Sequence, residues 1–277
     1  MLKANYHTHL KYCNHAIGST EDYVKVALEN GMTELGISDH APLLASFLNR
    51  EDFESFGKYY NHMTLDILYT KYLPEIAEAK QKYSDKIRIL SAFETEYLDS
   101  NAYFVRMLRK KVDYLNLGVH LFDFDGHVLN SYHDVNPTTI YGYLEACIKG
   151  IKLGVFNVVA HPDLFMFSYQ DKNGNRIFDK HCAYVSRKII EAAIQYDVYL
   201  ELNANGIQNS MTRGQDKNWL YPCREFWEIA KEYKNLKIII GADAHKPELL
   251  SGKYIAMAEQ FAKELELPIL DVMEIRH

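Results

Sequence analysis

Short apolar runs alternate with longer amphipathic stretches along the whole chain. The longer stretches carry apolar residues three and four positions apart, which is the spacing of helices with one buried face. Strands that alternate with helices predict parallel pairing in repeated βα units. The short runs, rich in β-branched residues, cover residues 2–9, 34–40, 87–94, 112–120, 155–162, 198–205 and 236–245.

The amphipathic stretches predict helices over residues 20–31, 136–154, 178–196, 222–233 and 247–265. For the first of these, Thr20 is the expected N-cap and Gly31 the residue that follows its end. The long stretch 50–83 predicts two helices that part near Pro74, because proline cannot donate the backbone hydrogen bond of a helix interior.

Seven strand–helix units over 277 residues predict an α/β fold, a distorted (β/α)7 TIM-like barrel slightly short of eight repeats. The continuous apolar runs NVVA and IIIGA indicate strands buried on both faces, as in parallel sheets. A doubly wound open sheet is the alternative. No Pro/Gly/Ser-rich linker divides the chain, so we expect one domain over residues 1–277.

Composition narrows the classes of partner. The net charge of −6 and the absence of a basic block disfavour nucleic acid as a partner. No apolar run approaches the ~20 residues of a membrane helix, and the N-terminus has no signal-peptide pattern. Four widely separated cysteines indicate a reducing compartment, so we expect a cytoplasmic protein without a membrane partner. The oligomeric state stays open.

Polar residues stand at one end of the expected strands. Side chains i and i+2 of a strand share a face, so the two histidines of HTH can bind one cation. In barrels and in open parallel sheets, the carboxyl ends of the strands form the active site. Six of the seven strands end in potential metal ligands, which are His7, His9, His40, Glu94, His120, His161, Asp243 and His245, with His15 on the loop after the first strand.

A metal site explains this pattern better than packing does. A single histidine at a strand end is more often a hydrogen-bonded packing residue than a ligand. Many imidazoles and carboxylates buried together would, however, carry a large desolvation cost without cations. Imidazole and carboxylate ligands suit Zn²⁺, Fe²⁺ and Mn²⁺, and the absence of cysteine pairs argues against a closed structural zinc site.

Nine candidate ligands suit three divalent transition-metal ions better than one. Such a cationic cluster favours a small anionic substrate, above all a phosphate ester. We expect a hydroxide that bridges two ions to attack phosphorus, without a phosphorylated protein intermediate. Glu94, Asp243 and His245 are the expected catalytic residues. Hydrolysis of an amide or ring would need fewer ions and usually a bridging lysine, and no strand ends in lysine.

The motifs YHTHLKYCNHA, GISDHAP, AFETEY, LGVH, VVAHPD and GADAHKP, in this order, resemble those of the PHP (polymerase and histidinol phosphatase) superfamily. GISDHAP and ELNANG are similar to the histidinol-phosphate phosphatase branch. The resemblance spans residues 2 to about 250. It implies a trinuclear site that hydrolyses L-histidinol phosphate to L-histidinol and phosphate in histidine biosynthesis.

The resemblance also implies how the ligands divide among the ions. One ion would take His7, His9, Glu94 and Asp243. A second would share Glu94 and add His120 and His161, and a third would take His15, His40 and His245. AFETEY departs from the glycine-first form of its motif, and Glu96 competes with Glu94, which the motif register favours.

Other polar residues are candidates for the substrate or for support of the ligands. Arg213, Glu201 and Asn203 lie near the end of the sixth strand, where Arg213 could hold phosphate with two parallel hydrogen bonds. Asp39, which precedes His40, could orient the imidazole of a ligand or could instead cap the strand end. Cys13 is expected to be a packing residue. His62, His127, His133 and His181 are expected on the surface or at helix ends.

Two other functions compete with histidinol phosphate hydrolysis. One is a phosphoesterase of the same fold that acts on nucleotides or another small phosphomonoester, which fold alone cannot exclude. The other is a non-catalytic metal-binding or regulatory protein. Loss of ligands would be expected of the latter, whereas every expected position is filled in this chain.

Overall fold

Seven parallel strands form the centre of the computed structural model, which describes residues 2–52, 54 and 62–276. Each strand pairs with the next one along the chain. The ring closes where the first strand meets the last, through a parallel bridge between Thr8 and Ala244. The strands are β1 (Ala4–Asn5), β2 (Glu34–Ile37), β3 (Arg88–Thr95), β4 (Tyr114–Leu117), β7 (Val158–Val159), β8 (Tyr199–Asn203) and β9 (Ile238–Gly241).

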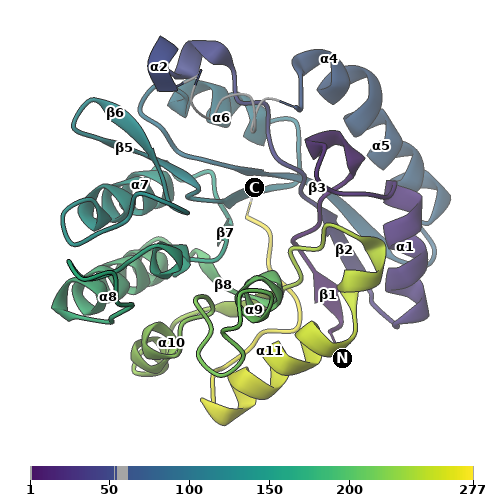
Figure 1. Cartoon of the computed structure of the whole chain (residues 1–277). Helices are drawn as coiled ribbons and strands as arrows, with labels where there is room; N and C mark the ends of the chain where they lie inside the picture. Colours follow the sequence, from purple (N-terminus) through teal and green to yellow (C-terminus); the bar gives the residue numbers. More distant parts are fainter. Residues whose placement is uncertain (1, 53, 55–61, 277) are drawn as a thin grey trace.

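The predicted seven-stranded barrel is confirmed, and the open-sheet alternative is wrong. A doubly wound sheet reverses its strand order at a switch point, which leaves the first strand in its interior. Here the order is sequential, and the backbone N–H of His9 donates to the carbonyl oxygen of Ala244 at 2.9 Å across the closing seam. Figure 1 shows the helices arranged around this ring of strands.

The helices match most of the expected stretches. They are α1 (Thr20–Glu29), α2 (Arg50–Asp52), α4 (Leu65–Ile67), α5 (Leu73–Lys82), α6 (Ala102–Arg109), α7 (Ile140–Lys152), α8 (Lys180–Gln195), α9 (Ala204–Met211), α10 (Arg224–Lys231) and α11 (Lys253–Glu264). The sequence analysis did not predict α6, α9 or the antiparallel hairpin of β5 (Leu121–Phe124) and β6 (His127–Asn130), which lie in the connections that follow β3, β8 and β4.

Two details of the predicted helices are wrong. Ser19, rather than Thr20, is the N-cap of α1, because its hydroxyl accepts from the N–H of Asp22 while the Asp22 carboxylate accepts from the N–H of Ser19. Pro74 does not end a helix. A π-helical turn over Leu68–Tyr72 joins α4 to α5, and this wider turn accommodates the proline. Part of the stretch 50–83 lies outside the described residues.

Apolar side chains fill both sides of the sheet. The larger cluster lies between the strands and the surrounding helices. A smaller cluster, with Tyr6, Tyr114 and Tyr199, includes residues that alternate along the strands with those of the larger one, as expected inside a barrel. Met273 of the C-terminal segment belongs to this inner cluster, and its N–H donates to the Tyr6 hydroxyl at 2.9 Å. Within the described residues, no helix combines the length and the apolar character needed to cross a bilayer.

Candidate metal centre

The carboxyl ends of the strands surround one cavity of about 620 Å³. Seven of the nine predicted ligands line it, whereas His7 and His161 are fully buried beside it. All nine come together because sequential parallel strands present their carboxyl ends at the same mouth of the barrel. The seven lining residues are His9, His15, His40, Glu94, His120, Asp243 and His245.

The carboxylate of Glu94 lies at the middle of this group. Its Oε1 is 2.8 Å from Nε2 of His161 and 3.5 Å from Nε2 of His120. Its Oε2 is 3.3 Å from Nε2 of His7 and 3.4 Å from Nδ1 of His40. Histidines that are far apart in the sequence therefore contact a single carboxylate.

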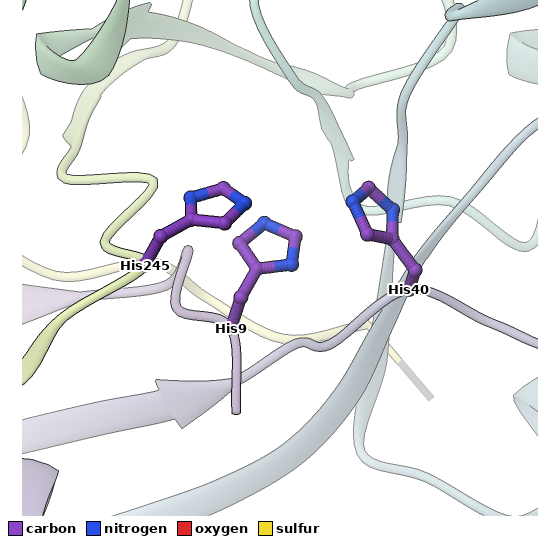
Figure 2. Close-up of side chains that lie close together, drawn as sticks. All are labelled: His9, His40 and His245. Carbon is purple, nitrogen blue, oxygen red and sulfur yellow. The ribbon is translucent and has the colours of Figure 1, made fainter. Parts of the chain in front are cut away.

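Potential donor atoms form overlapping triplets in which all atoms lie within 4.8 Å of one another. Figure 2 shows His9, His40 and His245 side by side. His15 joins no triplet, although its ring centre lies 4.9 Å from that of His245 and 5.2 Å from that of His40. The other triplets within the predicted set are His7–His9–Asp243, His7–Glu94–His161 and His40–Glu94–His120.

Oxygen atoms behind the imidazoles set their orientation. Nδ1 of His7 is 2.7 Å from Oε1 of Glu201, and Nδ1 of His120 is 3.0 Å from Oε1 of Glu96. Backbone oxygens serve His15 and His245, whose Nδ1 atoms lie 2.9 Å from the Cys13 carbonyl and 3.0 Å from the Asp243 carbonyl. A proton held on Nδ1 leaves the lone pair of Nε2 for a metal ion.

Carboxylates and imidazoles shift one another's pKa at the buried floor of the cavity. Burial disfavours a charge on His7, yet its pKa lies well above the usual value because of the charges of Glu201, Asp243 and Glu94. Burial likewise opposes the charge of Glu94, but the nearby imidazoles of His120 and His7 hold its pKa well below the usual value. Protons on the buried imidazoles therefore balance the negative charge of the carboxylates at the floor of the cavity.

Imidazoles nearer the mouth have the opposite shift. Burial and the neighbouring charge of His9 hold the pKa of His40 well below its usual value and lower that of His245 to about 3. The same two causes lower the pKa of His15. These imidazoles are neutral at pH 7 and keep the lone pairs that metal ions require.

This donor set fits divalent cations. Neutral imidazoles and ionised carboxylates converge within one water-accessible cavity, and cations could supply the positive charge that protons supply at His7. The backbone gives a second indication, because His161 and Asp243 have positive φ angles of 30° and 48°. Non-glycine residues in this region are uncommon and concentrate at functional sites.

Comparison with known families agrees with this geometry. Residues 5–205, most of the chain, match the family described as PHP domain. The chain belongs to this family. The match covers all or part of every strand of the barrel except β9, and it includes seven of the nine residues predicted as metal ligands.

Relatives of this PHP protein include named phosphatases. It is 23% identical over 263 residues to a protein of Deinococcus radiodurans named probable histidinol-phosphatase, and the alignment covers 87% of this chain and 85% of the relative. A solved structure from Listeria monocytogenes matches with a TM-score of 0.72 and 20% identity, over 92% of this chain and 99% of the other.

A second solved structure carries ligands. It is the histidinol phosphate phosphatase of Lactococcus lactis in complex with zinc, L-histidinol and phosphate. The TM-score is 0.69 at 15% identity, and the match covers 97% of this chain and 95% of the other. Both structural matches demonstrate that this PHP protein shares the fold of those chains.

The predicted substrate residues lie elsewhere than expected. Glu201 and Asn203 are buried among the predicted ligands: Oε2 of Glu201 accepts from the backbone N–H of His161 and from Nδ2 of Asn203. Asn203 also caps α9 and donates to Asp243 at 3.2 Å. Because these polar atoms are already engaged, both residues support the floor of the PHP site instead of facing a substrate.

Arg213 does not line the cavity. It is exposed just after α9, where its guanidinium donates to the carbonyl oxygen of Asn209 at 3.1 Å and lies over the ring of Phe167. The expectation that it reaches phosphate thus finds no support in its position. The loop after β8 forms a helix, and this turns Arg213 away from the strand ends.

Asp39 lies beside the imidazole of a predicted ligand, His9. Its Oδ1 lies 3.5 Å from Nδ1 of His9 and accepts the backbone N–H of His40, whose own ring faces Glu94. Cys13 is buried beside His9, and its thiol donates to the Leu10 carbonyl.

Several residues of the cavity wall escaped the sequence analysis. His62 lies outside any helix and lines the cavity, contrary to the expected surface or capping position. Lys246 contributes an ammonium group and follows directly after His245. Their neighbours in the wall include Tyr132 and three amides of α9, Asn205, Gln208 and Asn209. The i, i+3, i+4 spacing of these amides was the one available signal.

Proposed function

We propose that this PHP protein is a metal-dependent phosphomonoesterase that hydrolyses L-histidinol phosphate. The observation that carries the proposal is the convergence of nine potential ligands, from strands along the whole barrel, on one cavity. The names of its relatives and the ligands of the Lactococcus lactis structure supply the substrate. In the reaction, water attacks phosphorus, the bond to the alcohol oxygen breaks, and the alcohol leaves with a proton.

The residues that would hold three divalent ions, of zinc, iron or manganese, are the nine of the centre. Glu94 is central because its two oxygens face different groups of histidines. His7, His9 and Asp243 form a compact triplet beside it, while His15, His40 and His245 surround the mouth. When bound, such ions lower the pKa of water and neutralise the charge of phosphate oxygens.

The chain itself keeps this arrangement ready before the substrate binds. Glu201 and Glu96 hold the protons of two imidazoles on the side away from the cavity. Burial of Glu94 and His7 excludes bulk water from the floor, which strengthens their electrostatic interactions with an anionic substrate and its cations.

Lys246 is the residue that would assist phosphate binding. It lines the cavity next to His245, and no carboxylate of the described residues pairs with its ammonium group. An ammonium with three donors can hydrogen-bond phosphate oxygens as a compact positive charge. This is the role that the sequence analysis had assigned to Arg213.

Steady-state kinetics on L-histidinol phosphate, with bound metal measured in the same sample, test the proposal. We expect about three ions per chain and a kcat/KM at least tenfold above that for a 3′,5′-bisphosphonucleotide, with no activity on single-stranded DNA. Equal activity on all phosphate monoesters would contradict the assigned substrate. Fewer than two ions per chain in an inactive protein would contradict a catalytic role.

A further inference from the structure

One wall of the cavity is a row of amides on a single helix. Asn205, Gln208 and Asn209 stand at positions i, i+3 and i+4 of α9, so they share one face of that helix. All three are half-buried and line the same cavity as the predicted ligands. Asparagine has a low intrinsic preference for helices, so two of them on this face require another explanation.

Hydrogen bonds to the protein orient two of these amides. Nδ2 of Asn205 donates to Oδ2 of Asp243 at 3.1 Å, and Nδ2 of Asn209 donates to the Tyr221 hydroxyl at 2.9 Å. These bonds hold each amide in one orientation, in which the carbonyl oxygen stays free to accept and one N–H stays free to donate. The side chain of Gln208 forms no hydrogen bond with the described residues, so its carbonyl oxygen and its N–H groups are all available.

The row extends outward from the metal centre. Asn205 contacts Asp243 at the edge of the floor, and Asn209 lies one helical turn farther, on the order of 6 Å along the axis. A phosphate placed over the centre would therefore direct its alcohol portion along this face. The span suits a small alcohol of a few carbon atoms.

We infer that the inward face of α9 is the subsite for the leaving alcohol and selects alcohols that carry N–H donors, as an ammonium or an imidazole does. This inference rests on the proposed phosphatase function and deepens it. The carbonyl oxygens accept from an ammonium or imidazole N–H, and the hydrogen bond from an ammonium is charge-assisted and therefore stronger than one from a hydroxyl. L-Histidinol carries both kinds of donor.

The test compares 2-aminoethyl phosphate, whose alcohol bears an ammonium, with glycerol 3-phosphate, whose alcohol bears only hydroxyls. L-Histidinol phosphate is measured in parallel. Gln208→Leu and Asn209→Leu remove the acceptors, whereas Asn209→Asp replaces one by a carboxylate of the same shape. Gln195→Leu, at an exposed position of α8, is the matched control. Bound metal is measured in every variant.

We expect the ratio of kcat/KM for 2-aminoethyl phosphate to that for glycerol 3-phosphate to fall about tenfold in each leucine variant, chiefly through KM. In Asn209→Asp the ratio should rise, because a full negative charge attracts the ammonium more strongly. The control should keep the wild-type ratio. Metal content should match the wild type in all four variants.

Equal losses on both substrates, or an unchanged ratio in the leucine variants, would overturn the inference. Failure of the proposed function has a different signature. In that case the wild type would not prefer L-histidinol phosphate over 2-aminoethyl phosphate, while the response of the substrate ratio to the α9 variants would still decide the role of this face.

Discussion

Buried carboxylates support imidazoles from the side away from the cavity. Glu201 touches His7, and Glu96 touches His120, at distances that hold a proton on Nδ1. Such supporting partners govern which ring nitrogen has a free lone pair, and their loss weakens metal binding although they bind no metal themselves. Mutations can therefore distinguish the residues proposed to bind metal from the residues that orient their imidazoles.

Glu201→Gln should weaken metal binding at His7 by about 10- to 100-fold. A glutamine amide turned toward His7 would donate to Nδ1, which places the imidazole proton on Nε2, the nitrogen that faces Glu94. Titration of chelated protein with Zn²⁺ measures the affinity. Glu228→Gln, on an exposed helix position, is the control, and equal affinities in the two variants would contradict this role.

Gly118→Ala should displace Glu94. A Cβ atom at Gly118 would lie 2.4 Å from Oε1 of Glu94 and 2.8 Å from both Cδ and Cγ, so the whole side chain would have to shift. Because displacement of a catalytic group by about 1 Å can cost roughly 100-fold in rate, we expect a loss of that size together with lower metal content. Wild-type kinetics in a folded variant would argue against it.

Lys246→Met should raise the KM for L-histidinol phosphate about tenfold and the inhibition constant of inorganic phosphate in parallel. Arg213→Met is the informative comparison. The exposed position of Arg213 predicts a change of less than about twofold, whereas a direct contact of its guanidinium with phosphate would give a loss as large as that of Lys246→Met.

Helix ends contribute to the barrel at the scale of the element. The reciprocal hydrogen bonds of Ser19 and Asp22 fix the start of α1 directly after the loop that carries His15. Asn203 does the same for α9 and at the same time contacts Asp243, so the start of that helix is tied to the metal centre. A capped helix start close behind a strand therefore fixes the position of the candidate ligands on the short loop between them.

Ser19→Ala should lower the free energy of unfolding by about 1 kcal/mol, the usual cost of a lost N-cap. Thr20→Val should cost less than about half of that, because the Thr20 hydroxyl does not cap the helix. Urea unfolding followed by circular dichroism measures both. The reverse order would restore Thr20 as the cap, as the sequence pattern had suggested.

Closure of the barrel makes the site a property of the whole molecule. At the seam between the first and the last strand, Thr8 pairs with Ala244. Thr8 stands between His7 and His9, and Ala244 stands between Asp243 and His245, so these four predicted ligands flank the seam. Residues from the two ends of the chain therefore meet in one triplet. Removal of bound ions should therefore lower the stability of the entire fold.

Chelation should lower the melting temperature, on the order of 5 °C or more, because ions that bind only the folded chain stabilise it by mass action. Calorimetry of protein treated with a chelator, and of the same sample after Zn²⁺ is restored, measures the shift. A melting temperature that does not change on chelation would mean that the nine residues hold no ion in the folded protein.

The sequence alone predicted the fold class, which the structure confirms, and the gathering of nine candidate ligands at one end of the barrel. The hydrophobic periods of strands and helices depend on neighbouring residues only, so they can be recognised without a structure. Parallel strands of a barrel must present their carboxyl ends on the same side. This brought His7 and Asp243 into one prediction although more than 200 residues separate them. Helix α9 escaped prediction because it begins at Ala204, inside the run 198–205 that predicted a strand.

Tertiary structure decided which polar residues face the cavity and which lie behind it. Glu94 and Glu96 share a strand face in the sequence pattern, but only packing directs one to the centre and the other to the back of His120. Likewise Glu201 was expected to face the substrate and lies beneath His7, while Lys246 lines the cavity and Arg213 does not. Spacing sets the end of the strand where a residue stands, whereas the direction of its side chain depends on neighbours that are distant in sequence.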